Sequence, residues 1–475
     1  MNYYFLGIGG IGMSALARFF HRRGDTVSGY DRTESPLTRQ LAEEGIAVHY
    51  TDDPALVPDK IDLVVYTPAV PADTAEFRYL EEKGVPMRKR SQVLGELTEG
   101  KKCIAVAGTH GKTSTSTLIA HILSHTEFGC SAFLGGISKN FDSNVVVDTK
   151  SDYVVVEADE YDRSFLQLHP YCAVITATEA DHLDIYGTRE HLVEAFRQFA
   201  EQITPDGSLV IKQGVALVSD ESDEHDHHEH DHHEHHDLRE ELGISNTQFS
   251  ILNYTAHGIE ADYYPWNVRN YGGNIFFDLR TPKGVLYDLE LPESSLYNVE
   301  NAVAAAAVVM TLGVNEHQLR YGLKTYRGVR RRFDYRIKTK ELVMIDDYAH
   351  HPQEIAACLE SIRYLYPGKR VVGIFQPHLY SRTRDFADQF AEVLSTLDEL
   401  VMMPIYPARE KPIPGVTSSM VLRKIDSMSK YLCTPDQVLE LIPALCPDIV
   451  VTMGAGDIDR LVPRLEETLR NTLEE

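Results

Sequence analysis

A lysine and a threonine close a glycine turn at residues 108–113, which read Gly-Thr-His-Gly-Lys-Thr. An apolar run precedes the turn at residues 103–107, and residues 114–125 have the apolar spacing of a helix. In such a turn a lysine ammonium reaches the β- and γ-phosphates of a nucleotide, and the adjoining hydroxyl binds Mg²⁺. Val106 stands where the full motif has its first glycine. The sequence therefore predicts a variant phosphate-binding loop formed by Gly108, Thr109, His110, Gly111, Lys112, Thr113 and Ser114.

Acidic residues follow two further apolar runs. Glu157 comes directly after residues 153–156, and His182 ends a cluster at residues 179–182 that follows the run at residues 173–176. Because ligands of an open α/β sheet collect at the carboxyl ends of its strands, we expect both clusters to face the phosphates. Carboxylates and an imidazole suit Mg²⁺ or Mn²⁺, and two such ions can bridge phosphate oxygens. The predicted metal ligands are Thr113, Glu157 and His182.

Arginines at positions 327, 330, 331 and 332 stand out in an acidic chain. Guanidinium groups at a domain junction can clamp a transferring phosphoryl group, and the alternative is a basic surface patch. Further along, polar residues 346–352 and 376–383 each follow an apolar run. Two polar strand ends in one block indicate a second substrate site.

Another glycine turn lies near the start of the chain. Gly7, Gly9 and Gly12 match G-x-G-x-x-G, and Asp31 lies close to the position of the ribose-binding acid in dinucleotide folds. A diphosphate can approach this bare backbone and the N-terminus of the following helix, so NAD, FAD and UDP-sugars all remain candidates. The alternative is a tight turn that only allows close helix packing.

Three blocks of alternating strands and helices must position these residues. A length of 475 residues exceeds one hydrophobic core, and the apolar runs are continuous, as in sheets covered on both faces. We predict an α/β fold with a Rossmann-like domain at residues 1–98, a P-loop ATPase-like domain at 99–326 and a second Rossmann-like domain at 327–475.

Composition limits the classes of function. The formal net charge of −25 disfavours binding to nucleic acid or to membrane surfaces, and no apolar run reaches the roughly 20 residues of a membrane span. Six cysteines are scattered without a C-x-x-C pair, which is typical of reduced, buried thiols. We expect a cytoplasmic protein without membrane insertion.

Eight histidines and eight acidic residues fill residues 221–237. Such a segment cannot bury an apolar face, so we predict a solvated, disordered insertion at about residues 220–237. The histidines and carboxylates leave weak chelation of Zn²⁺ or Ni²⁺ open as an alternative.

Together these residues resemble the ATP-dependent Mur ligases of peptidoglycan synthesis, and among them most the alanine-adding members. The resemblance runs nearly the length of the chain. The matching residues are 7–14, 108–113, 157–162, 179–184, 298, 301, 331–333, 347–352 and 454–457.

The resemblance implies three domains that bind a UDP-sugar, ATP and an amino acid, in that order. It implies that the lactyl carboxylate of UDP-N-acetylmuramate attacks the ATP γ-phosphate, and that L-alanine displaces phosphate from the resulting acyl phosphate through a tetrahedral intermediate. The implied cofactors are ATP and Mg²⁺, as two ions with Mn²⁺ as a substitute. The expected assembly is a monomer or a weak homodimer.

The resemblance also assigns roles. Lys112 and one of Arg331 or Arg332 neutralise the γ-phosphate, Asn298 contacts adenine, and Asp347 contacts the ribose. The amino-acid residues are Tyr348, His350 and Arg382, of which His350 also counts as catalytic. The UDP-sugar residues are Gly9, Gly10, Ile11, Gly12, Met13, Ser14, Asp31 and Thr67. Asn301 joins the ATP site.

Two positions depart from relatives in this superfamily. Leu379 replaces the first of two arginines that the segment at residues 375–383 commonly carries. Residues 190–202 contain no lysine, so we predict no carbamoylated lysine there.

Three other functions remain open at this point. A recycling ligase would attach a preformed tripeptide to the same UDP-sugar. An NAD-dependent oxidoreductase would use the first glycine turn but leaves the second turn and the arginines unexplained. A nucleotide-gated binding protein would bind ATP without amino-acid-dependent phosphate release.

Overall fold

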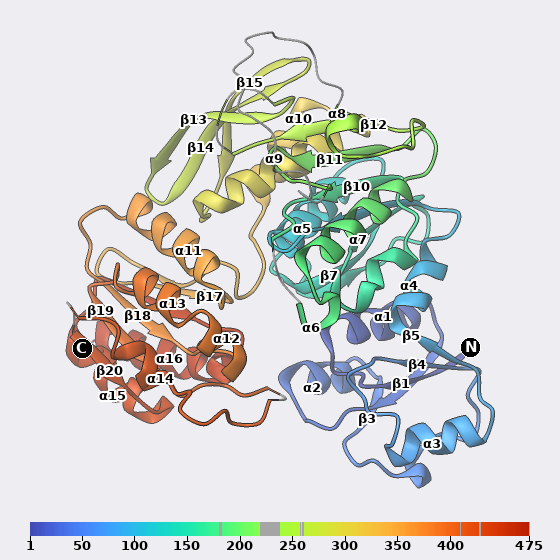
Figure 1. Ribbon diagram of the computed structural model, residues 1–475, viewed down its shortest axis with the longest axis horizontal. Helices are drawn as coiled ribbons and strands as arrows, with labels where there is room; N and C mark the ends of the chain where they lie inside the picture. The colour runs from blue at the N-terminus through green and yellow to red at the C-terminus, as the bar shows by residue number, and fades with distance from the viewer. Residues whose placement is uncertain are drawn as a thin grey trace. The chain divides into compact units, whose positions relative to one another are not determined.

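A computed structural model of the chain describes residues 1–179, 183–218, 238–256, 258, 261–408, 410–426 and 429–474 (Figure 1). The chain forms two compact units. The first unit consists of Met1–Trp266, Asp278–Leu289 and Glu300–Tyr326. The second unit consists of Asn267–Phe277, Glu290–Val299 and Arg327–Glu475.

The first unit begins with a five-stranded parallel sheet in the order β3-β2-β1-β4-β5. Its strands are β1 (Asn2–Leu6), β2 (Thr26–Tyr30), β3 (Ala47–His49), β4 (Leu63–Tyr66) and β5 (Met87–Lys89). The accompanying helices are α1 (Ile11–Arg22), α2 (Pro36–Glu43), η1 (Pro54–Leu56), α3 (Ala75–Glu82) and α4 (Arg90–Thr98). The central strand β1 is buried from Tyr3 to Leu6, as a sheet with both faces covered requires.

A seven-stranded sheet follows in the same unit, in the order β12-β11-β10-β6-β9-β7-β8. Its strands are β6 (Lys102–Ala107), β7 (Ser131–Ser138), β8 (Ser143–Val146), β9 (Tyr153–Glu157), β10 (Cys172–Ile175), β11 (Ser208–Lys212) and β12 (Ser250–Tyr254). Its helical segments are α5 (Lys112–Leu123), η2 (Tyr161–Gln167), α6 (Leu183–Tyr186), α7 (Arg189–Glu201), α8 (Leu238–Glu241), α10 (Glu316–Thr325) and, from Glu300 onward, α9 (Leu296–Thr311). Among the described strand pairs of this sheet, β7–β8 is antiparallel and the others are parallel.

Helix α1 joins the two sheets of the first unit, because it packs against β7 and β8 as well as against β2. Phe19 of α1 contacts Phe133 of β7, with ring centroids 5.1 Å apart. The fully buried Arg18 donates to Asn144 of β8 at 2.6 Å and forms an ion pair with Glu44 at 2.8 Å. One apolar core therefore runs through both sheets, and the first glycine turn is held against the second sheet.

The second unit has a six-stranded sheet in the order β16-β17-β21-β18-β19-β20, parallel except for the β16–β17 pair. Its strands are β16 (Asp334–Lys338), β17 (Val343–Asp347), β18 (Val371–Phe375), β19 (Glu399–Met402), β20 (Ser429–Leu432) and β21 (Ile449–Met453). Its helices are α11 (Pro352–Leu365), α12 (Tyr380–Asp385), α13 (Ala387–Leu394), α14 (Ser418–Leu422), α15 (Pro435–Leu445), η3 (Asp457–Arg460) and α16 (Leu461–Glu474).

A three-stranded sheet, β13-β14-β15, has no counterpart among the predicted elements. It is formed by β13 (Tyr264–Tyr271), β14 (Asn274–Thr281) and β15 (Gly284–Leu291). The predicted domain boundaries at residues 98 and 326 stay predictions, although α4 ends at Thr98 and the long segment of the second unit begins at Arg327.

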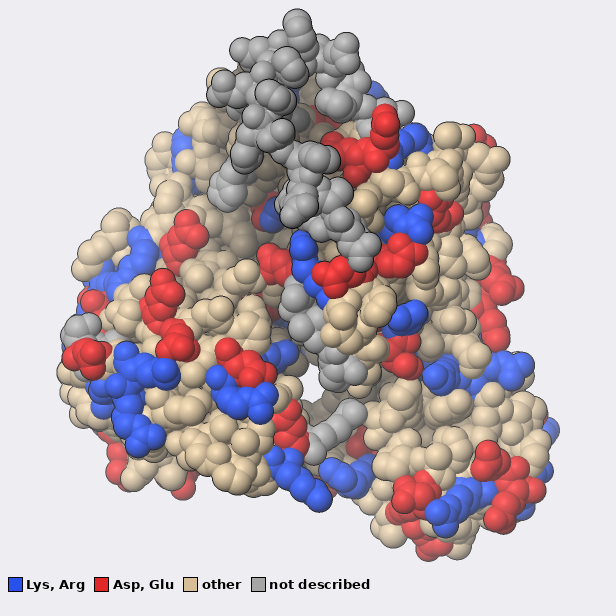
Figure 2. Space-filling view, viewed as in Figure 1, with Lys and Arg blue, Asp and Glu red and all other residues tan. Residues whose placement is uncertain are grey.

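Among the described helices, none is both long and apolar enough to cross a membrane. On the visible face, basic and acidic side chains are interspersed despite the net charge of −25 (Figure 2). Positive charge is therefore present locally on this face despite the acidic net charge.

His121 of α5 gives the first unit a pH-dependent stability. Burial lowers its pKa to about 4, and His125 adds to the effect. Since a histidine in the unfolded chain has a pKa near 6.5, the unfolded state takes up the proton first as the pH falls. Stability is therefore lost between about pH 6.5 and pH 4, by about 2 kcal/mol from pH 7 to pH 5.

Urea denaturation at pH 7 and at pH 5 measures this effect. Between these two pH values, we expect the free energy of unfolding of His121→Gln to fall by about 2 kcal/mol less than that of the wild type. The exposed His317 of α10 supplies the control, because His317→Gln leaves the pH dependence of the wild type. An identical pH dependence in the wild type and His121→Gln would contradict a neutral, buried imidazole.

Candidate functional site

The first glycine turn connects β1 to α1. Gly7 has a φ of 86°, and the N–H groups of Gly7 and Ile8 donate to the Tyr30 carbonyl at 2.8 and 3.0 Å. A Cβ atom at Gly7 would lie 2.8 Å from Cγ2 of Thr67, which follows β4. The turn thus needs glycine here, and it brings predicted residue Thr67 next to Gly7.

Asp31 shapes this turn. One of its carboxylate oxygens accepts the Gly9 N–H at 2.8 Å, and the other accepts the Thr33 N–H at 3.0 Å. A Cβ atom at Gly9 would come within 2.8 Å of the same carboxylate. Asp31 therefore lies at the turn, and each of its oxygens binds a backbone N–H group. Its role in ligand binding stays a prediction.

The residues after the turn differ in exposure. Ile11 is 37% exposed, whereas Met13 is 2% exposed and belongs to the apolar core. Ser14 is buried, donates to the Ile11 carbonyl at 2.9 Å and accepts from Asn144 at 2.9 Å. Met13 and Ser14 thus support the turn from beneath.

The second glycine turn lies between β6 and α5, as predicted. Gly108 has a φ of 128° and Gly111 a φ of 79°. A Cβ atom would lie 2.1 Å from Thr176 Oγ1 at Gly108, and 2.6 Å from Asn301 Oδ1 at Gly111. Two separate reasons therefore require glycine at both positions: the positive φ disfavours any other residue, and a side chain would have no space. Gly111 is the N-cap of α5 and has no side chain that could cap the first N–H groups of this helix.

Thr176 and Glu179 follow β10 and hold this turn from the neighbouring strand. The Thr176 hydroxyl lies within hydrogen-bond distance of the His110 and Ala107 carbonyl groups. The Thr109 N–H donates to the Ala177 carbonyl at 3.0 Å, and His110 Nε2 lies 3.1 Å from a Glu179 carboxylate oxygen. The loop is thus fixed by backbone and side-chain contacts before any phosphate binds.

Lys112 projects back over its own loop. Its Nζ donates to the Gly108 carbonyl at 2.7 Å and to Glu160 Oε1 at 2.8 Å, and Glu160 is only 1% exposed. Burial alone would lower the pKa of Lys112, but the carboxylates of Glu160, Asp159 and Glu157 outweigh it and raise the pKa. The ammonium is therefore positively charged at neutral pH and sits among acceptors that a phosphate can replace.

Glu157 ends β9, which pairs with β6 so that Glu157 lies opposite Val106. Its Oε2 accepts the Gly135 N–H at 3.0 Å, and a Cβ atom at Gly135 would overlap this carboxylate. Thr113 is buried in the first turn of α5. The adjacent strand ends bring a hydroxyl and a carboxylate, both ligands that Mg²⁺ accepts, to the same edge of the sheet.

His182 lies outside the described residues, as do Ala180 and Asp181. The predicted histidine-rich insertion at residues 220–237 also lies outside them. In the described part of the chain, no three His, Cys, Asp or Glu side chains form a group that could hold a metal ion. The ligand role of His182 stays a prediction.

Asn301 of α9 lies at the second turn, where Thr115 donates to its Oδ1 at 3.3 Å. Asn298 belongs to the second unit, and its N–H donates to Ser295 Oγ at 3.3 Å. The structure therefore places Asn301 at the loop, and the adenine contact of Asn298 stays a prediction.

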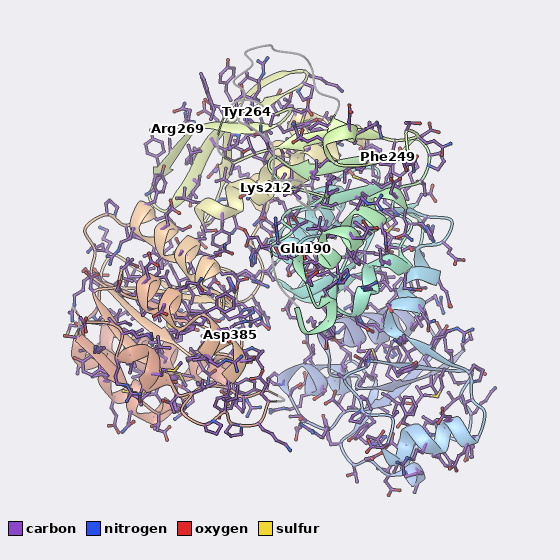
Figure 3. The ribbon with its side chains drawn as sticks, viewed as in Figure 1. Glu190, Lys212, Phe249, Tyr264, Arg269 and Asp385 are labelled. Atoms are coloured by element: carbon purple, nitrogen blue, oxygen red, sulfur yellow. The ribbon has the colours of Figure 1, made fainter. Side chains whose placement is uncertain are left out.

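The lysine-free segment at residues 190–202 forms most of α7, which starts just before Glu190 (Figure 3). The next lysine is Lys212 at the end of β11, whose Nζ pairs with Glu300 at 2.5 Å. The absence of a carbamoylated lysine stays a prediction.

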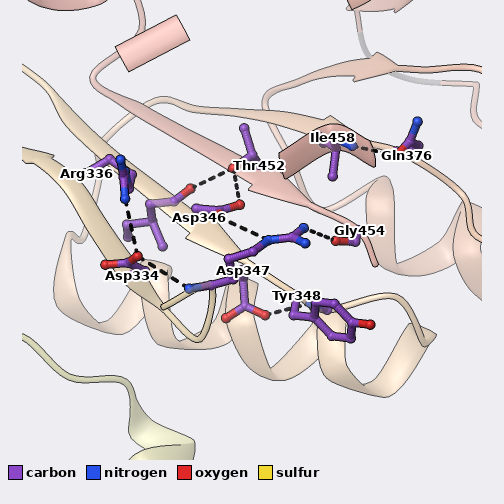
Figure 4. A network of polar contacts seen from close by, with 12 residues as sticks. Asp334, Arg336, Asp346, Asp347, Tyr348, Gln376, Thr452, Gly454 and Ile458 are labelled. Atoms are coloured by element: carbon purple, nitrogen blue, oxygen red, sulfur yellow. Dashed lines mark hydrogen bonds and ion pairs between the residues drawn. The ribbon is translucent and has the colours of Figure 1, made fainter. Parts of the chain in front are cut away.

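A buried polar network fills the carboxyl end of β17 in the second unit (Figure 4). Arg331 donates to the Gly454 carbonyl at 2.6 Å and lies 3.4 Å from Asp346, which also accepts from Thr452 at 2.8 Å. Burial raises the pKa of Asp346 to about 6, although Arg331 opposes this shift. Arg331 is thus committed to the fold of its own unit.

Asp347 lies beside this network and binds three donors. It accepts from the Tyr297 hydroxyl at 2.8 Å and from the Phe333 and Ala349 N–H groups at 2.7 Å each. Burial raises its pKa, and Arg332 is the strongest opposing influence. Asp347 is therefore held rigidly at the end of β17, where a ligand was predicted.

Tyr348 and His350 follow Asp347. The Tyr348 ring has the guanidinium groups of Arg331 and Arg332 at 5.1 and 4.9 Å from its centroid. His350 Nδ1 lies 3.0 Å from the Tyr348 carbonyl and 3.3 Å from Glu354. Burial lowers the pKa of His350, with Arg382 and Arg332 contributing in the same direction.

A second histidine completes this cluster. His378 follows β18, its ring centroid lies 5.9 Å from that of His350, and it stacks on Tyr406 at 5.8 Å. Burial lowers its pKa to about 4, and the charge of Arg382 contributes. The structure thus brings together the three predicted amino-acid residues Tyr348, His350 and Arg382, and adds His378.

Leu379 opens α12 in a strained conformation with φ 70° and ψ 139°. Its N–H donates to the Tyr406 carbonyl at 3.0 Å, while Glu410 accepts the Ser381 N–H at 3.0 Å. These contacts fix the first turn of the helix that carries Arg382.

Sequence reasoning missed Glu160 as the partner of Lys112 and Thr176 as the support of the loop, and it placed His378 in a polar strand end without giving it a role. Thr176 and His378 each lie at or just beyond a strand end that was predicted. The position of Thr176 and His378 at the end of a buried strand was therefore the sequence signal that could have identified them as site residues.

Three family descriptions match successive parts of the chain. Residues 2–102 match the Mur ligase family catalytic domain, residues 106–309 the Mur ligase middle domain, and residues 331–456 the Mur ligase glutamate ligase domain.

Two relatives that match nearly the whole chain carry the same name. The UDP-N-acetylmuramate–L-alanine ligase of Phocaeicola vulgatus is 45% identical over 468 residues, which cover 97% of this chain and 96% of that protein. The Porphyromonas gingivalis ligase of the same name is 46% identical, with 98% of each chain covered.

Solved structures agree with this. The crystal structure of the UDP-N-acetylmuramate–alanine ligase of Thermotoga maritima has a TM-score of 0.81 at 25% identity, with 99% of this chain and 100% of that one covered. A murein peptide ligase from Psychrobacter arcticus shares the fold, with a TM-score of 0.68 at 22% identity over 99% of each chain. Its two glycine turns, its three mainly parallel sheets and the relatives that match nearly its whole length together place this chain in the Mur ligase family.

Proposed function

We propose that this protein joins L-alanine to the lactyl carboxylate of UDP-N-acetylmuramate and converts ATP to ADP and phosphate. A carboxylate oxygen bonds to the γ-phosphorus while the bond to ADP breaks. The amine nitrogen then adds to the acyl carbon, and the tetrahedral intermediate expels phosphate. The product is the amide that starts the peptide of the peptidoglycan precursor.

One observation carries this proposal: relatives named for this reaction are 45–46% identical over 97–98% of the chain. The structure supports it with a preformed phosphate loop in the first unit. Because the reaction uses ATP and a UDP-sugar, we place it in the cytoplasm, and a monomer or weak homodimer suffices since one chain contains all three family domains.

The residues of the second turn fit ATP. Side-chain-free glycines at positions 108 and 111 let phosphate oxygens approach the backbone N–H groups that begin α5. Lys112 exchanges the Gly108 carbonyl and Glu160 for phosphate oxygens and neutralises charge that develops in phosphoryl transfer. Asn298 contacts adenine and Asp347 the ribose.

Thr113 and Glu157 would hold one Mg²⁺, and His182 a second, with Mn²⁺ as a substitute. When bound, the metal neutralises oxygens of the β- and γ-phosphates. Thr113 contributes its hydroxyl, and Glu157 is aimed at this edge by the Gly135 N–H.

The two arginines have different roles. Because Arg331 is bound to Gly454 and Asp346, we assign the contact with the γ-phosphate to Arg332. Arg331 then fixes the backbone from which Arg332 projects.

The other substrates bind at the remaining polar strand ends. The UDP-sugar binds the first turn through the backbone of residues 9–14, with Asp31 holding the turn and Thr67 beside it. L-Alanine binds at Tyr348, His350 and Arg382, with its carboxylate on the guanidinium.

The test is phosphate release with ATP, UDP-N-acetylmuramate and each amino acid in turn. Release that depends on the UDP-sugar and is strongest with L-alanine is expected. The tripeptide L-alanyl-γ-D-glutamyl-meso-diaminopimelate serves as the competing acceptor, and a preference for it would replace this proposal by the recycling reaction.

A further inference from the structure

Arg90 lies between the first glycine turn and the acidic residues after β9, within the first unit. It is the first residue of α4 and directly follows β5. Its Nη2 lies 3.5 Å from Asp159 Oδ2, and its side chain is 20% exposed. A Cβ atom at Gly12 would come within 2.9 Å of Nη1 and 3.1 Å of Cδ. The guanidinium thus covers the start of α1 and remains partly accessible.

The glycine at position 12 is explained by this arginine. The φ of Gly12 lies outside the left-handed region, so the backbone does not demand glycine there. At Gly10, two residues earlier, a Cβ atom would find its first neighbour only at 3.6 Å. Glycine at position 12 is therefore required by the Arg90 guanidinium, which occupies the space of a Cβ atom, and not by the backbone conformation of the turn.

The present partner of Arg90 is held loosely. The distance of 3.5 Å to Asp159 exceeds the roughly 2.7–2.9 Å of a charge-assisted hydrogen bond, and Asp159 is 41% exposed. A guanidinium offers a rigid fork that matches phosphate and carboxylate groups, so a substrate anion at the turn can displace Asp159.

We propose that Arg90 binds an anionic group of UDP-N-acetylmuramate, either its diphosphate or its lactyl carboxylate, and leaves Asp159 when it does so. This inference rests on the proposed function and adds a substrate-binding residue to it. Arg90 thus places a positive charge between two parts of the site. On one side is the first glycine turn, and on the other are Asp159 and Glu160, whose carboxylates act on Lys112.

Titration calorimetry of the full-length protein with UDP-N-acetylmuramate, without ATP, tests this. Arg90→Ala is expected to weaken binding about ten- to a hundredfold, since a charge-assisted contact is lost. Arg90→Lys restores part of the affinity, because it keeps the charge but not the fork. The matched control is Arg88→Ala, which removes an exposed guanidinium paired with Glu96 at 3.5 Å and leaves the affinity within about twofold.

UDP-N-acetylglucosamine, which lacks the lactyl group, separates the two anions. An equal loss for both sugar nucleotides assigns Arg90 to the diphosphate. A loss confined to UDP-N-acetylmuramate assigns it to the lactyl carboxylate. Unchanged binding of both by Arg90→Ala overturns the proposal.

Asp159→Asn tests whether Arg90 exchanges Asp159 for the substrate anion. An arginine with only a structural role would not show such an exchange. Removal of the competing carboxylate is expected to tighten UDP-N-acetylmuramate binding several-fold, and unchanged or weaker binding overturns the exchange. If the wild type binds UDP-N-acetylmuramate and forms product while Arg90→Ala binds equally well, only the Arg90 inference fails. If the wild type does neither, the proposed function fails.

Discussion

Replacing Lys112 by methionine is expected to reduce the rate of ATP- and alanine-dependent phosphate release by about a thousandfold. The ammonium is held at the loop, 2.7 Å from the Gly108 carbonyl, and nearby carboxylates keep it charged. Its loss removes charge stabilisation that matters most as the γ-phosphate transfers. Binding of UDP-N-acetylmuramate to the first turn, measured without ATP, should change by less than about threefold.

A fold control is required, because Lys112 also neutralises the buried Glu160. Removing one partner of such a pair costs about 3–5 kcal/mol. The double variant Lys112→Met/Glu160→Gln removes the stranded charge as well, so it should regain stability without regaining activity. Lys101→Ala, which breaks an exposed pair with Asp152 at 3.7 Å, should retain both. Near-wild-type phosphate release in a folded Lys112→Met protein would contradict the phosphate-loop assignment.

The predicted strands at the centres of the sheets share one property: nearly all of their side chains are buried. Residues 103–107 and 371–375 are apolar throughout, and they form the buried strands β6 and β18. Such runs directly precede the glycine turns and polar segments predicted to bind ligands. The prediction of a strand and the prediction of a site at its end therefore agree with each other. This is why the central strands of all three parallel sheets could be predicted.

Several of the strands that were missed lie at edges or outside the parallel sheets, although the internal strands β7 and β11 were missed as well. β13 and β15 are partly exposed along most of their length and carry polar residues such as Asn267 and Asp288. β20, an edge strand, is exposed or half-exposed at every position. Where neither face is fully buried, the sequence lacks an apolar run and no periodic signal remains.

Site residues divide in the same way. Lys112 and Gly108 could be predicted because the loop motif is local in sequence. Arg90, 78 residues from Gly12, could not be predicted, because only the folded chain brings its guanidinium over that glycine. Met13 is the opposite case. It lies inside the matching stretch at residues 7–14, but its side chain is buried in the apolar core.

Arg382 is expected to hold the carboxylate of L-alanine, and Arg382→Ala should raise the KM for alanine by about ten- to a hundredfold. Its charge contributes to the lowered pKa of both His350 and His378, so the guanidinium lies in the neighbourhood of both imidazoles. The helix start that carries it is fixed by Glu410 and by the strained Leu379. The resemblance to the family implies an arginine at the position of Leu379, so we expect more of the carboxylate interaction to fall to Arg382.

Steady-state kinetics with alanine varied at saturating ATP and UDP-N-acetylmuramate measures this effect. Arg384 offers the matched control, because it lies on the same helix and pairs with Asp385 at 2.7 Å on the surface. Arg384→Ala should leave the KM within about twofold, and the KM for ATP should barely move in either variant. Arg382→Lys should fall between the wild type and Arg382→Ala, since an ammonium keeps the charge without the bidentate geometry. A KM for alanine that stays at the wild-type value in Arg382→Ala would show that another group holds the carboxylate, and His378, the added member of this cluster, would be the next residue to replace.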